Sequence, residues 1–210
     1  MLKILIADDH AIVRQGLKQI VAETRDMVVA GEASNGQELF NKLKEDDYDV
    51  IVLDITMPGR SGIDVLRQLR SERPRLPVLI LSVHSEEQYA LRALRAGASG
   101  YLTKESAPDE LVVAIRKVSL GGKYISSSLA EKLAFQLEAG HEQAPHETLS
   151  DREYQVLCMI ASGKTVMEIA QDLSLSEKTI STYRTRILEK MNMKNNAELT
   201  YYAIKNQLVD

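Results

Sequence analysis

Short apolar runs alternate with stretches of helical periodicity through the first 121 residues, and this alternation limits the possible folds more than any other feature. The runs predict strands at 3–7, 27–33, 49–54, 77–82 and 100–103. The stretches between them have the apolar spacing of helices, at about 11–23, 36–45, 61–71, 86–96 and 107–119. Continuous apolar segments such as VIVL (50–53) are typical of strands covered on both faces. We therefore predict an α/β doubly wound, five-stranded parallel sheet with helices on both sides.

The remaining chain has a different character. Residues 122–147 include SSS, Gly140 and Pro145, which favour a linker, and the segment 129–137 within it predicts a short helix. From Thr148 onward we find helical signals only, beginning with Ser150 as an N-cap and Glu153 as its capping-box partner. The predicted organisation is thus a domain at 1–121, a linker at 122–147 and an all-α domain at 148–210.

Polar side chains stand where the predicted strands end. Asp8 and Asp9 follow the first strand, Asp54 ends the third, Ser82 ends the fourth and Lys104 follows the fifth. The carboxyl ends of parallel strands share one edge of a sheet, so these groups should lie close together. Crowded carboxylates repel one another unless a cation lies among them, and oxygen ligands with room for water suit Mg²⁺. Such a site would leave Asp54 as a nucleophile for a phosphoryl group, with Mg²⁺ and Lys104 neutralising charge.

Simpler interpretations exist for each of these residues taken singly. Asp9 could cap the helix that begins near Ala11, and Lys104 could be an ordinary surface lysine. His10 and His84 lie near the same edge, but neither has a second histidine or cysteine at ligand spacing, so we expect them to be structural or exposed. It is the joint occurrence of the acids and the lysine, in this chain order, that indicates chemistry.

The first domain resembles the receiver domain of bacterial two-component response regulators. The motifs that carry the resemblance are ADD (7–9), LDITMPGRSG (53–62), ILS (80–82) and GYLTK (100–104). The resemblance implies a flavodoxin-like fold in which Asp54 accepts a phosphoryl group from a sensor histidine kinase. It also implies that Asp9, Asp54 and the backbone carbonyl of Thr56 bind Mg²⁺, with Asp8 acting through water.

The same resemblance assigns roles to three more residues. Ser82 would bond a phosphoryl oxygen, Lys104 would pair with the phosphoryl group, and Tyr101 would be a switch residue that turns inward as Ser82 moves. The alternative for Tyr101 is a packed ring with its hydroxyl in solvent. Val83 stands where members of the family more often have Ala or Gly.

The all-α domain contains a helix–turn–helix pattern in TVMEIAQDLSLSEKTISTYRTRILEKM (165–191). Ser176 is placed to cap the second helix. From Ser176 to Lys194 there are five basic and two acidic residues, a local excess of +3 in a chain whose net charge is −4. A helix–turn–helix places its second helix in the major groove of DNA. The alternative is an ordinary helical hairpin with a solvated charged face.

This segment resembles the LuxR-type helix–turn–helix, and a receiver joined to it is a response regulator of the NarL/FixJ type. The resemblance assigns two kinds of DNA contact to the second helix. Base contacts would come from Lys178, Ser181, Thr182 and Thr185, and phosphate contacts from Thr179, Arg184 and Lys190. The final helix, 197–208, would supply a dimer contact on DNA.

Together these features predict a transcription regulator and not an enzyme. Phosphorylation of Asp54 would control homodimerisation and binding to double-stranded DNA, with RNA polymerase as a candidate partner. No apolar run approaches the roughly 18–20 residues that span a bilayer, and the N-terminus lacks the features of a signal peptide, so we expect a cytoplasmic protein without membrane contact.

Three alternatives remain open at this point. The chain could be a phosphatase of the haloacid dehalogenase kind, although such enzymes need a second Asp where Thr56 stands. It could bind DNA independently of phosphate, with the receiver as a scaffold, or its output domain could bind RNA.

Overall fold

The computed structural model describes residues 1–83, 86–127, 129–131 and 144–209. They belong to two compact units, Met1–Leu133 and Ala134–Asp210. Each unit is described by itself below.

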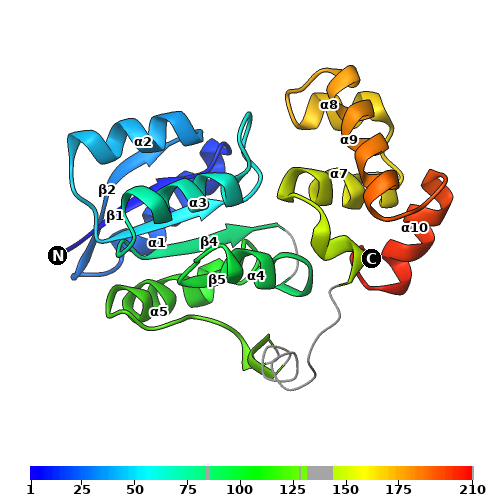
Figure 1. Cartoon of the computed structure of the whole chain (residues 1–210). Coiled ribbons are helices and arrows are strands. Elements are labelled where there is room, and N and C mark those ends of the chain that lie inside the picture. The colour runs from blue at the N-terminus through cyan, green and yellow to red at the C-terminus, as the bar shows by residue number, and fades with distance from the viewer. Residues whose placement is uncertain (84–85, 128, 132–143, 210) are drawn as a thin grey trace. The chain divides into compact units, whose positions relative to one another are not determined.

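The first unit is built on a parallel sheet in the strand order β2-β1-β3-β4-β5 (Figure 1). The strands are β1 (Leu2–Ala7), β2 (Met27–Ala33), β3 (Val50–Asp54), β4 (Val78–Ser82) and β5 (Gly100–Thr103). This arrangement confirms the predicted doubly wound sheet, and each strand lies within one residue of its predicted bounds.

Helices follow each strand, as the apolar spacing predicts. They are α1 (Ala11–Ala22), α2 (Gly36–Glu45), α3 (Gly62–Glu72), α4 (Glu86–Arg95) and α5 (Ala107–Ser119). Local capping determines two of the starts, since Asn35 accepts a hydrogen bond from Glu38 N and Ser61 accepts one from Ile63 N.

The core lies on both faces of the sheet. On one face, residues of alternate sequence position, such as Ile4, Val52 and Leu81, pack with residues of α1 and α5 such as Leu17 and Leu111. The intervening strand residues point to the opposite face because side chains alternate along a strand. They too are fully buried, as Leu5, Ile51, Leu53 and Ile80 show. Burial on both faces holds the strand ends in fixed register, which positions the site described below.

The chain stays attached to the sheet beyond α5. Tyr124 forms an isolated parallel bridge with Gly100, its carbonyl accepts a hydrogen bond from Tyr101 N at 3.1 Å, and its N–H donates to Ser99 O at 3.0 Å. Ser126 binds the Glu86 carboxylate of α4 through both its N–H and its hydroxyl. These contacts extend past residue 121, where the sequence predicts the linker to begin. Of the helix predicted at 129–137, residues 129–131 are helical and the rest lies outside the described residues.

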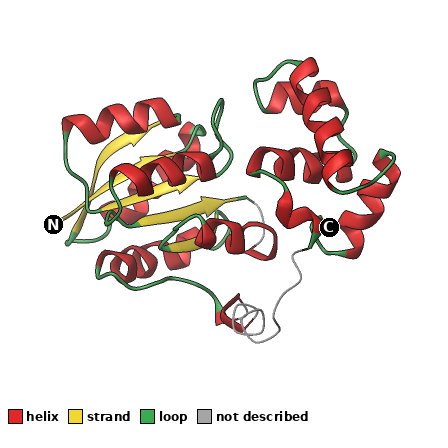
Figure 2. Cartoon of the chain, viewed as in Figure 1, coloured by secondary structure: helices red, strands yellow, loops and turns green. Residues whose placement is uncertain are grey.

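The described part of the second unit is entirely helical (Figure 2). A 3-10 helix, η1 (Pro145–Thr148), precedes α7 (Asp151–Ala161), α8 (Val166–Asp172), α9 (Glu177–Lys190) and α10 (Asn196–Lys205). The predicted capping box of Ser150 and Glu153 is present, and Thr165 and Glu168 form a second one at the start of α8. Ile169, Leu173, Ile180, Ile187 and Leu199 are fully buried in the core of this unit.

The last helix ends three residues before its predicted end at Leu208. Gln207 adopts a left-handed conformation with φ of 55°, and Leu208 N then bonds back to Ala203 O at 2.9 Å. This is the Schellman arrangement that terminates helices, and the burial of Leu208 completes it. In the part of the chain that the structure describes, no helix has both the length and the apolar character needed to traverse a bilayer.

Candidate functional site

The carboxyl ends of β1, β3 and β5 bring three charged side chains together, as the strand order predicts. Asp8 and Asp54 are each 1% exposed, and the Lys104 ammonium lies between them. Lys104 Nζ is 2.6 Å from Asp8 Oδ2 and 2.8 Å from Asp54 Oδ2. The lysine is therefore an integral part of the site and not an ordinary surface residue.

Burial controls the electrostatics of this cluster. Burial raises the pKa of Asp54 from 3.8 to about 6, although the Lys104 ammonium opposes this and Asp8 adds to it. Burial also disfavours the charged form of Lys104, but Asp54 and Asp8 outweigh it and raise the pKa of the ammonium. Without a further cation, the site thus holds a carboxyl group whose ionisation is costly.

The loop after β3 explains why an apolar strand ends in an acid and a turn. Thr56 N donates to Asp54 Oδ1 at 3.1 Å, which fixes the second oxygen of the carboxylate. Gly59 has φ of 79°, a conformation that favours glycine. Gly62 N donates to Ile55 O at 2.8 Å, and a Cβ at Gly62 would collide with the backbone carbonyl of Asp54. The turn thereby brings the start of α3 against the backbone of the acid.

The acidic end of the sheet fits a divalent cation. Asp8, Asp9, His10 and Asp54 each offer a ligand atom, and these atoms all lie within 4.8 Å of one another. Asp9 Oδ1 is buried, and none of the described residues donates a hydrogen bond to it. The structure also answers the capping alternative for Asp9, because the N-cap of α1 is His10 and no side-chain cap bond is found there. Oxygen ligands of this kind suit Mg²⁺.

The predicted switch residues are both interior. Ser82 is completely buried at the end of β4, and its carbonyl accepts a hydrogen bond from Lys104 N at 2.7 Å. Tyr101 is 2% exposed, which contradicts the alternative of a hydroxyl in solvent. Val83, directly after β4, is 66% exposed. His84 lies outside the described residues.

In the second unit, α8 and α9 form the predicted helix–turn–helix. Lys178, Ser181, Thr182 and Thr185 are all exposed on α9, as base-contacting residues must be. The Thr182 and Thr185 hydroxyls donate to the backbone carbonyls of Lys178 and Ser181 at 2.9 and 3.1 Å. Because each hydroxyl hydrogen is used in this way, the two oxygens can only accept hydrogen bonds from DNA. They could therefore bind base edges that donate, and not base edges that accept.

The residues predicted to hold phosphates have partners within the unit. Thr179 Oγ1 lies 2.8 Å from Ser176 Oγ, and Arg184 Nε donates to Asn196 Oδ1 of α10 at 2.6 Å. Lys190 Nζ donates to Glu153 Oε2 of α7 at 2.6 Å. A shallow hollow on α9 is lined by Ser176, Lys178, Thr179, Thr182, Tyr183 and Arg186. Tyr183 and Arg186 were not among the predicted contacts, although the basic excess of this segment included Arg186.

A parallel sheet in this strand order, with a buried aspartate bridged by a lysine, defines a receiver fold, and the second unit is a helix–turn–helix. The model of the response regulator receiver domain matches residues 4–116, and that of bacterial regulatory proteins of the luxR family matches residues 147–203. The chain therefore belongs to the two-component response regulators with a LuxR-type DNA-binding domain. Membership of this family makes it a regulator and not an enzyme, as predicted.

Similar proteins match this chain over nearly their whole length. The response regulator UvrY of Escherichia coli K12 is 37% identical over 209 residues, covering 99% of this chain and 96% of UvrY. The response regulator GacA of Pseudomonas aeruginosa PAO1 is 36% identical over 211 residues, covering 100% and 99%. A structure of RcsB from Salmonella enterica serovar Typhimurium, bound to promoter rprA in the presence of the phosphomimetic BeF3−, is 28% identical with a TM-score of 0.66, covering 96% of this chain and 98% of that one.

Proposed function

We propose that a sensor histidine kinase transfers a phosphoryl group to Asp54, and that this transfer controls dimerisation and sequence-specific DNA binding to regulate transcription. The observation that carries the proposal is the position of Lys104 Nζ, within 2.8 Å of both Asp54 and Asp8 in a buried cluster. An ammonium group at this place neutralises the charge that an incoming phosphoryl group brings to Asp54.

The chemistry requires little more than positioning and charge neutralisation. The Asp54 carboxylate attacks phosphorus, so a P–O bond forms while the P–N bond to the kinase imidazole breaks. The Asp54 oxygens are held in place by Thr56 N and Lys104 Nζ. Asp9, Asp54 and the carbonyl of Thr56 would hold Mg²⁺, with Asp8 acting through water, and the ion would neutralise negative charge on the phosphoryl oxygens.

The phosphoryl group would also change the contacts at the ends of β4 and β5. Lys104 now bridges two carboxylates, and a phosphoryl oxygen would compete for its hydrogen bonds. Ser82 lies at the end of β4, where its hydroxyl would bond another phosphoryl oxygen, and Tyr101 on β5, which already lies in the interior, would keep that inward position as Ser82 moves. These changes favour one of two pre-existing states of the α4–β5 surface.

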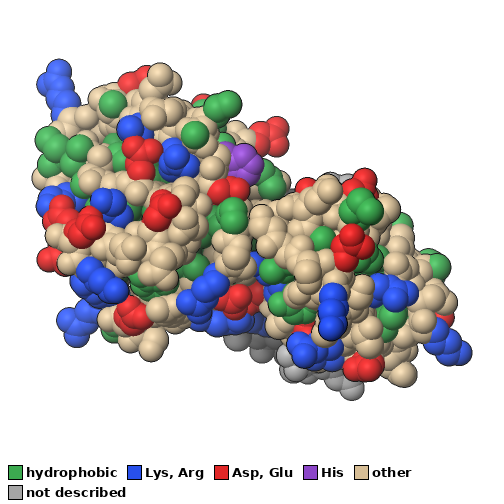
Figure 3. Space-filling view, turned by 90° about the horizontal axis from the view of Figure 1, so that it is seen from above, with side chains coloured by type: hydrophobic (Ala, Val, Ile, Leu, Met, Phe, Trp, Pro, Cys, Tyr) green, Lys and Arg blue, Asp and Glu red, His purple; other side chains and the backbone are tan. Residues whose placement is uncertain are grey.

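The active state would bind DNA through α9 as a dimer. Figure 3 shows basic side chains interspersed with acidic ones on the face that it presents, and the net charge of the chain is −4. Overall charge therefore does not drive DNA binding, and recognition depends on the local basic excess of α9. Residues of α9 would read bases in the major groove while its cations hold phosphates. The RcsB structure, which is bound to a promoter in the presence of the phosphomimetic BeF3−, supports DNA binding in the phosphorylated state.

Acetyl phosphate and Mg²⁺ test the acceptor site directly. The wild-type chain should gain one acid-labile phosphoryl group, measured by intact mass, and Asp54→Asn should gain none. Asp47→Asn is the matched control, because the Asp47 side chain is 93% exposed and precedes the amino end of β3, whereas Asp54 stands at its carboxyl end. Phosphorylation of Asp54→Asn to the wild-type level would refute the assignment.

Selection of DNA from a random pool, with and without beryllofluoride, tests the output. We expect enrichment of a two-fold symmetric duplex site with half-sites about one helical turn apart, and stronger enrichment with beryllofluoride. Equal affinity in both conditions would instead support DNA binding independent of phosphate.

A further inference from the structure

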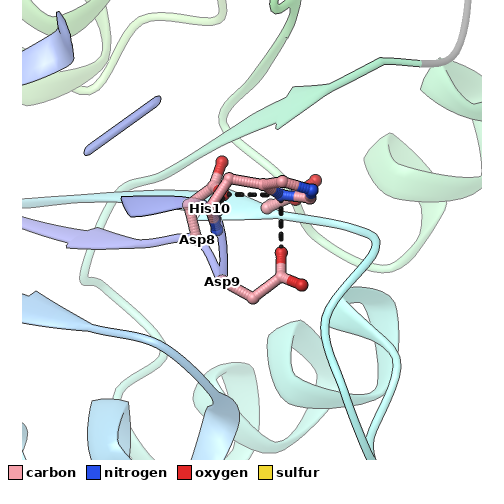
Figure 4. Close-up of side chains that lie close together, drawn as sticks. Asp8, Asp9 and His10 are labelled. Carbon is pink, nitrogen blue, oxygen red and sulfur yellow. Dashed lines mark hydrogen bonds and ion pairs between the residues drawn. The ribbon is translucent and has the colours of Figure 1, made fainter. Parts of the chain in front are cut away.

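His10 directly follows the two acids at the end of β1, and its ring lies against both of them (Figure 4). Its Nδ1 is 2.8 Å from Asp9 Oδ1 and 3.3 Å from Asp8 Oδ1. The backbone N–H of His10 also donates to Asp8 Oδ1 at 2.8 Å, so the residue is anchored to the cluster at two points. The side chain is 60% exposed, which leaves the ring free of any packing role in the core.

His10 Nδ1 lies 2.8 Å from Asp9 Oδ1, close enough for a hydrogen bond, but the two atoms do not have the geometry of one. Asp9 Oδ1 is a buried acceptor that receives no hydrogen bond from any residue of the described ranges. Nδ1 makes a hydrogen bond with Asp8 Oδ1 at 3.3 Å in the tautomer that carries the proton on Nδ1. In the tautomer with the proton on Nε2, the Nδ1 lone pair and Asp9 Oδ1 are two acceptors 2.8 Å apart, and such a pair is suited to share a cation. Ligands on adjacent corners of an octahedral ion, each about 2.1 Å from the metal, are about 3.0 Å apart. The two distances from Nδ1 lie on either side of that value.

We propose that His10 Nδ1 is a ligand of the divalent cation at this site, alongside the carboxylate oxygens. The inference rests on the metal site of the proposed function and adds a nitrogen donor to it. Mg²⁺ prefers oxygen ligands, whereas imidazole increases the affinity for later divalent metals such as Co²⁺. His10 therefore gives this receiver a relative preference for transition-metal ions that carboxylates and carbonyls alone would not provide.

Mn²⁺ bound to the full-length chain provides the direct test. Electron spin-echo spectroscopy should show coupling of Mn²⁺ to a ¹⁴N nucleus. Labelling the histidines with ¹⁵N should replace this coupling with one to ¹⁵N. The coupling should vanish in His10→Ala and in His10→Gln and persist in His146→Ala, whose histidine belongs to the second unit. The labelling experiment needs no variant, so it stands even where a substitution disturbs folding.

Affinities for the two classes of metal give a second readout. In titrations with Co²⁺ and Mg²⁺, His10→Ala should lose roughly tenfold or more in Co²⁺ affinity, with a much smaller loss for Mg²⁺. Bound Mn²⁺ without histidine nitrogen coupling, or an unchanged ratio of Co²⁺ to Mg²⁺ affinity, overturns the proposal for His10 while leaving the metal site in place. If Asp9→Asn and Asp54→Asn also leave Mn²⁺ binding unchanged, the metal site of the proposed function fails with it.

Discussion

Lys190 at the end of α9 donates from Nζ to Glu153 Oε2 at 2.6 Å, which ties the proposed recognition helix to the first turn of α7. Glu153 is 4% exposed by its side chain and also accepts a hydrogen bond from Ser150 N at 2.8 Å. Burial alone would raise the pKa of Glu153, but Lys190 and Ser150 outweigh it and lower the pKa. The contact between α9 and α7 thus includes a residue to which the resemblance assigned a DNA phosphate.

Lys190→Met should therefore lower the stability of the second unit. The substitution leaves a buried carboxylate without its cation, at a cost of about 1–3 kcal/mol in the free energy of unfolding. Denaturation by urea, followed by circular dichroism, measures the change. Lys194→Met removes an exposed lysine beyond α9 and should cost much less. Equal stability of the two variants would show that the Lys190–Glu153 pair contributes nothing.

The salt dependence of DNA affinity should show whether Arg184 contacts a DNA phosphate itself or acts only through its hydrogen bond to Asn196. Arg184→Ala removes one proposed phosphate contact and should reduce the slope of log affinity against log salt by about 1, on all sequences alike. Asn196→Ala removes the partner of Arg184 and retains the charge. It should leave the slope unchanged while lowering affinity modestly. If both variants change the slope equally, Arg184 acts through Asn196 and not on a phosphate.

The raised pKa of Asp54 predicts a pH-dependent stability in metal-free solution. The folded state binds this proton more tightly than the unfolded chain does, since the pKa rises from 3.8 to about 6 on folding. Raising the pH from 4 to 8 therefore destabilises the wild type relative to Asp54→Asn. At pH 8 the variant should be more stable by about 1–3 kcal/mol, and the difference should diminish as the pH falls from about 6 to about 4.

Thermal unfolding in EDTA at a series of pH values measures this difference. If the difference in stability between Asp54→Asn and the wild type stays constant from pH 4 to pH 8, Asp54 titrates normally. Mg²⁺ should reduce this difference at pH 8, because the ion stabilises the ionised wild type more than the variant.

Gly62 and Gly16 form a matched pair for testing the loop after β3. A Cβ at Gly62 would meet the backbone of Asp54 and Ile55, whereas a Cβ at Gly16 in α1 has nothing within 4 Å. Gly62→Ala should destabilise the first unit by roughly 2 kcal/mol or more and slow phosphorylation by acetyl phosphate. Gly16→Ala should stabilise α1 by about 0.5–1 kcal/mol and leave the phosphorylation rate unchanged. A normal rate in a folded Gly62→Ala protein would contradict the role of this loop.

The sheet and the strand-end residues were predictable because their signals are local. An apolar run such as 50–53 identifies a buried strand, and the polar residue that follows it marks the edge where ligands bind. If these strands are parallel neighbours in one sheet, their carboxyl ends share an edge, which brings Asp8, Asp54 and Lys104 together. The capping of α7 by Ser150 was equally local.

Features that depend on distant partners could not be predicted in this way. The sequence shows that Arg184 and Lys190 are basic, but their partners Asn196 and Glu153 lie on other helices. Similarly, His10 lacks a histidine or cysteine at ligand spacing, and only the fold brings Asp54 beside it. A charge on a helix is thus readable from sequence, whereas what that charge binds requires the tertiary structure.

The pairing of Tyr124 with β5 has a practical consequence for building chimaeras. A receiver truncated at residue 121 would lose the hydrogen bonds that Tyr124 makes with Ser99 and Tyr101, as well as the Ser126 contact to α4. Grafts onto a foreign output module should therefore be joined after Ser126, so that the outer edge of the sheet keeps its own cover. A junction placed earlier would expose backbone donors and acceptors of β5 to the incoming module, and an exposed strand edge invites aggregation.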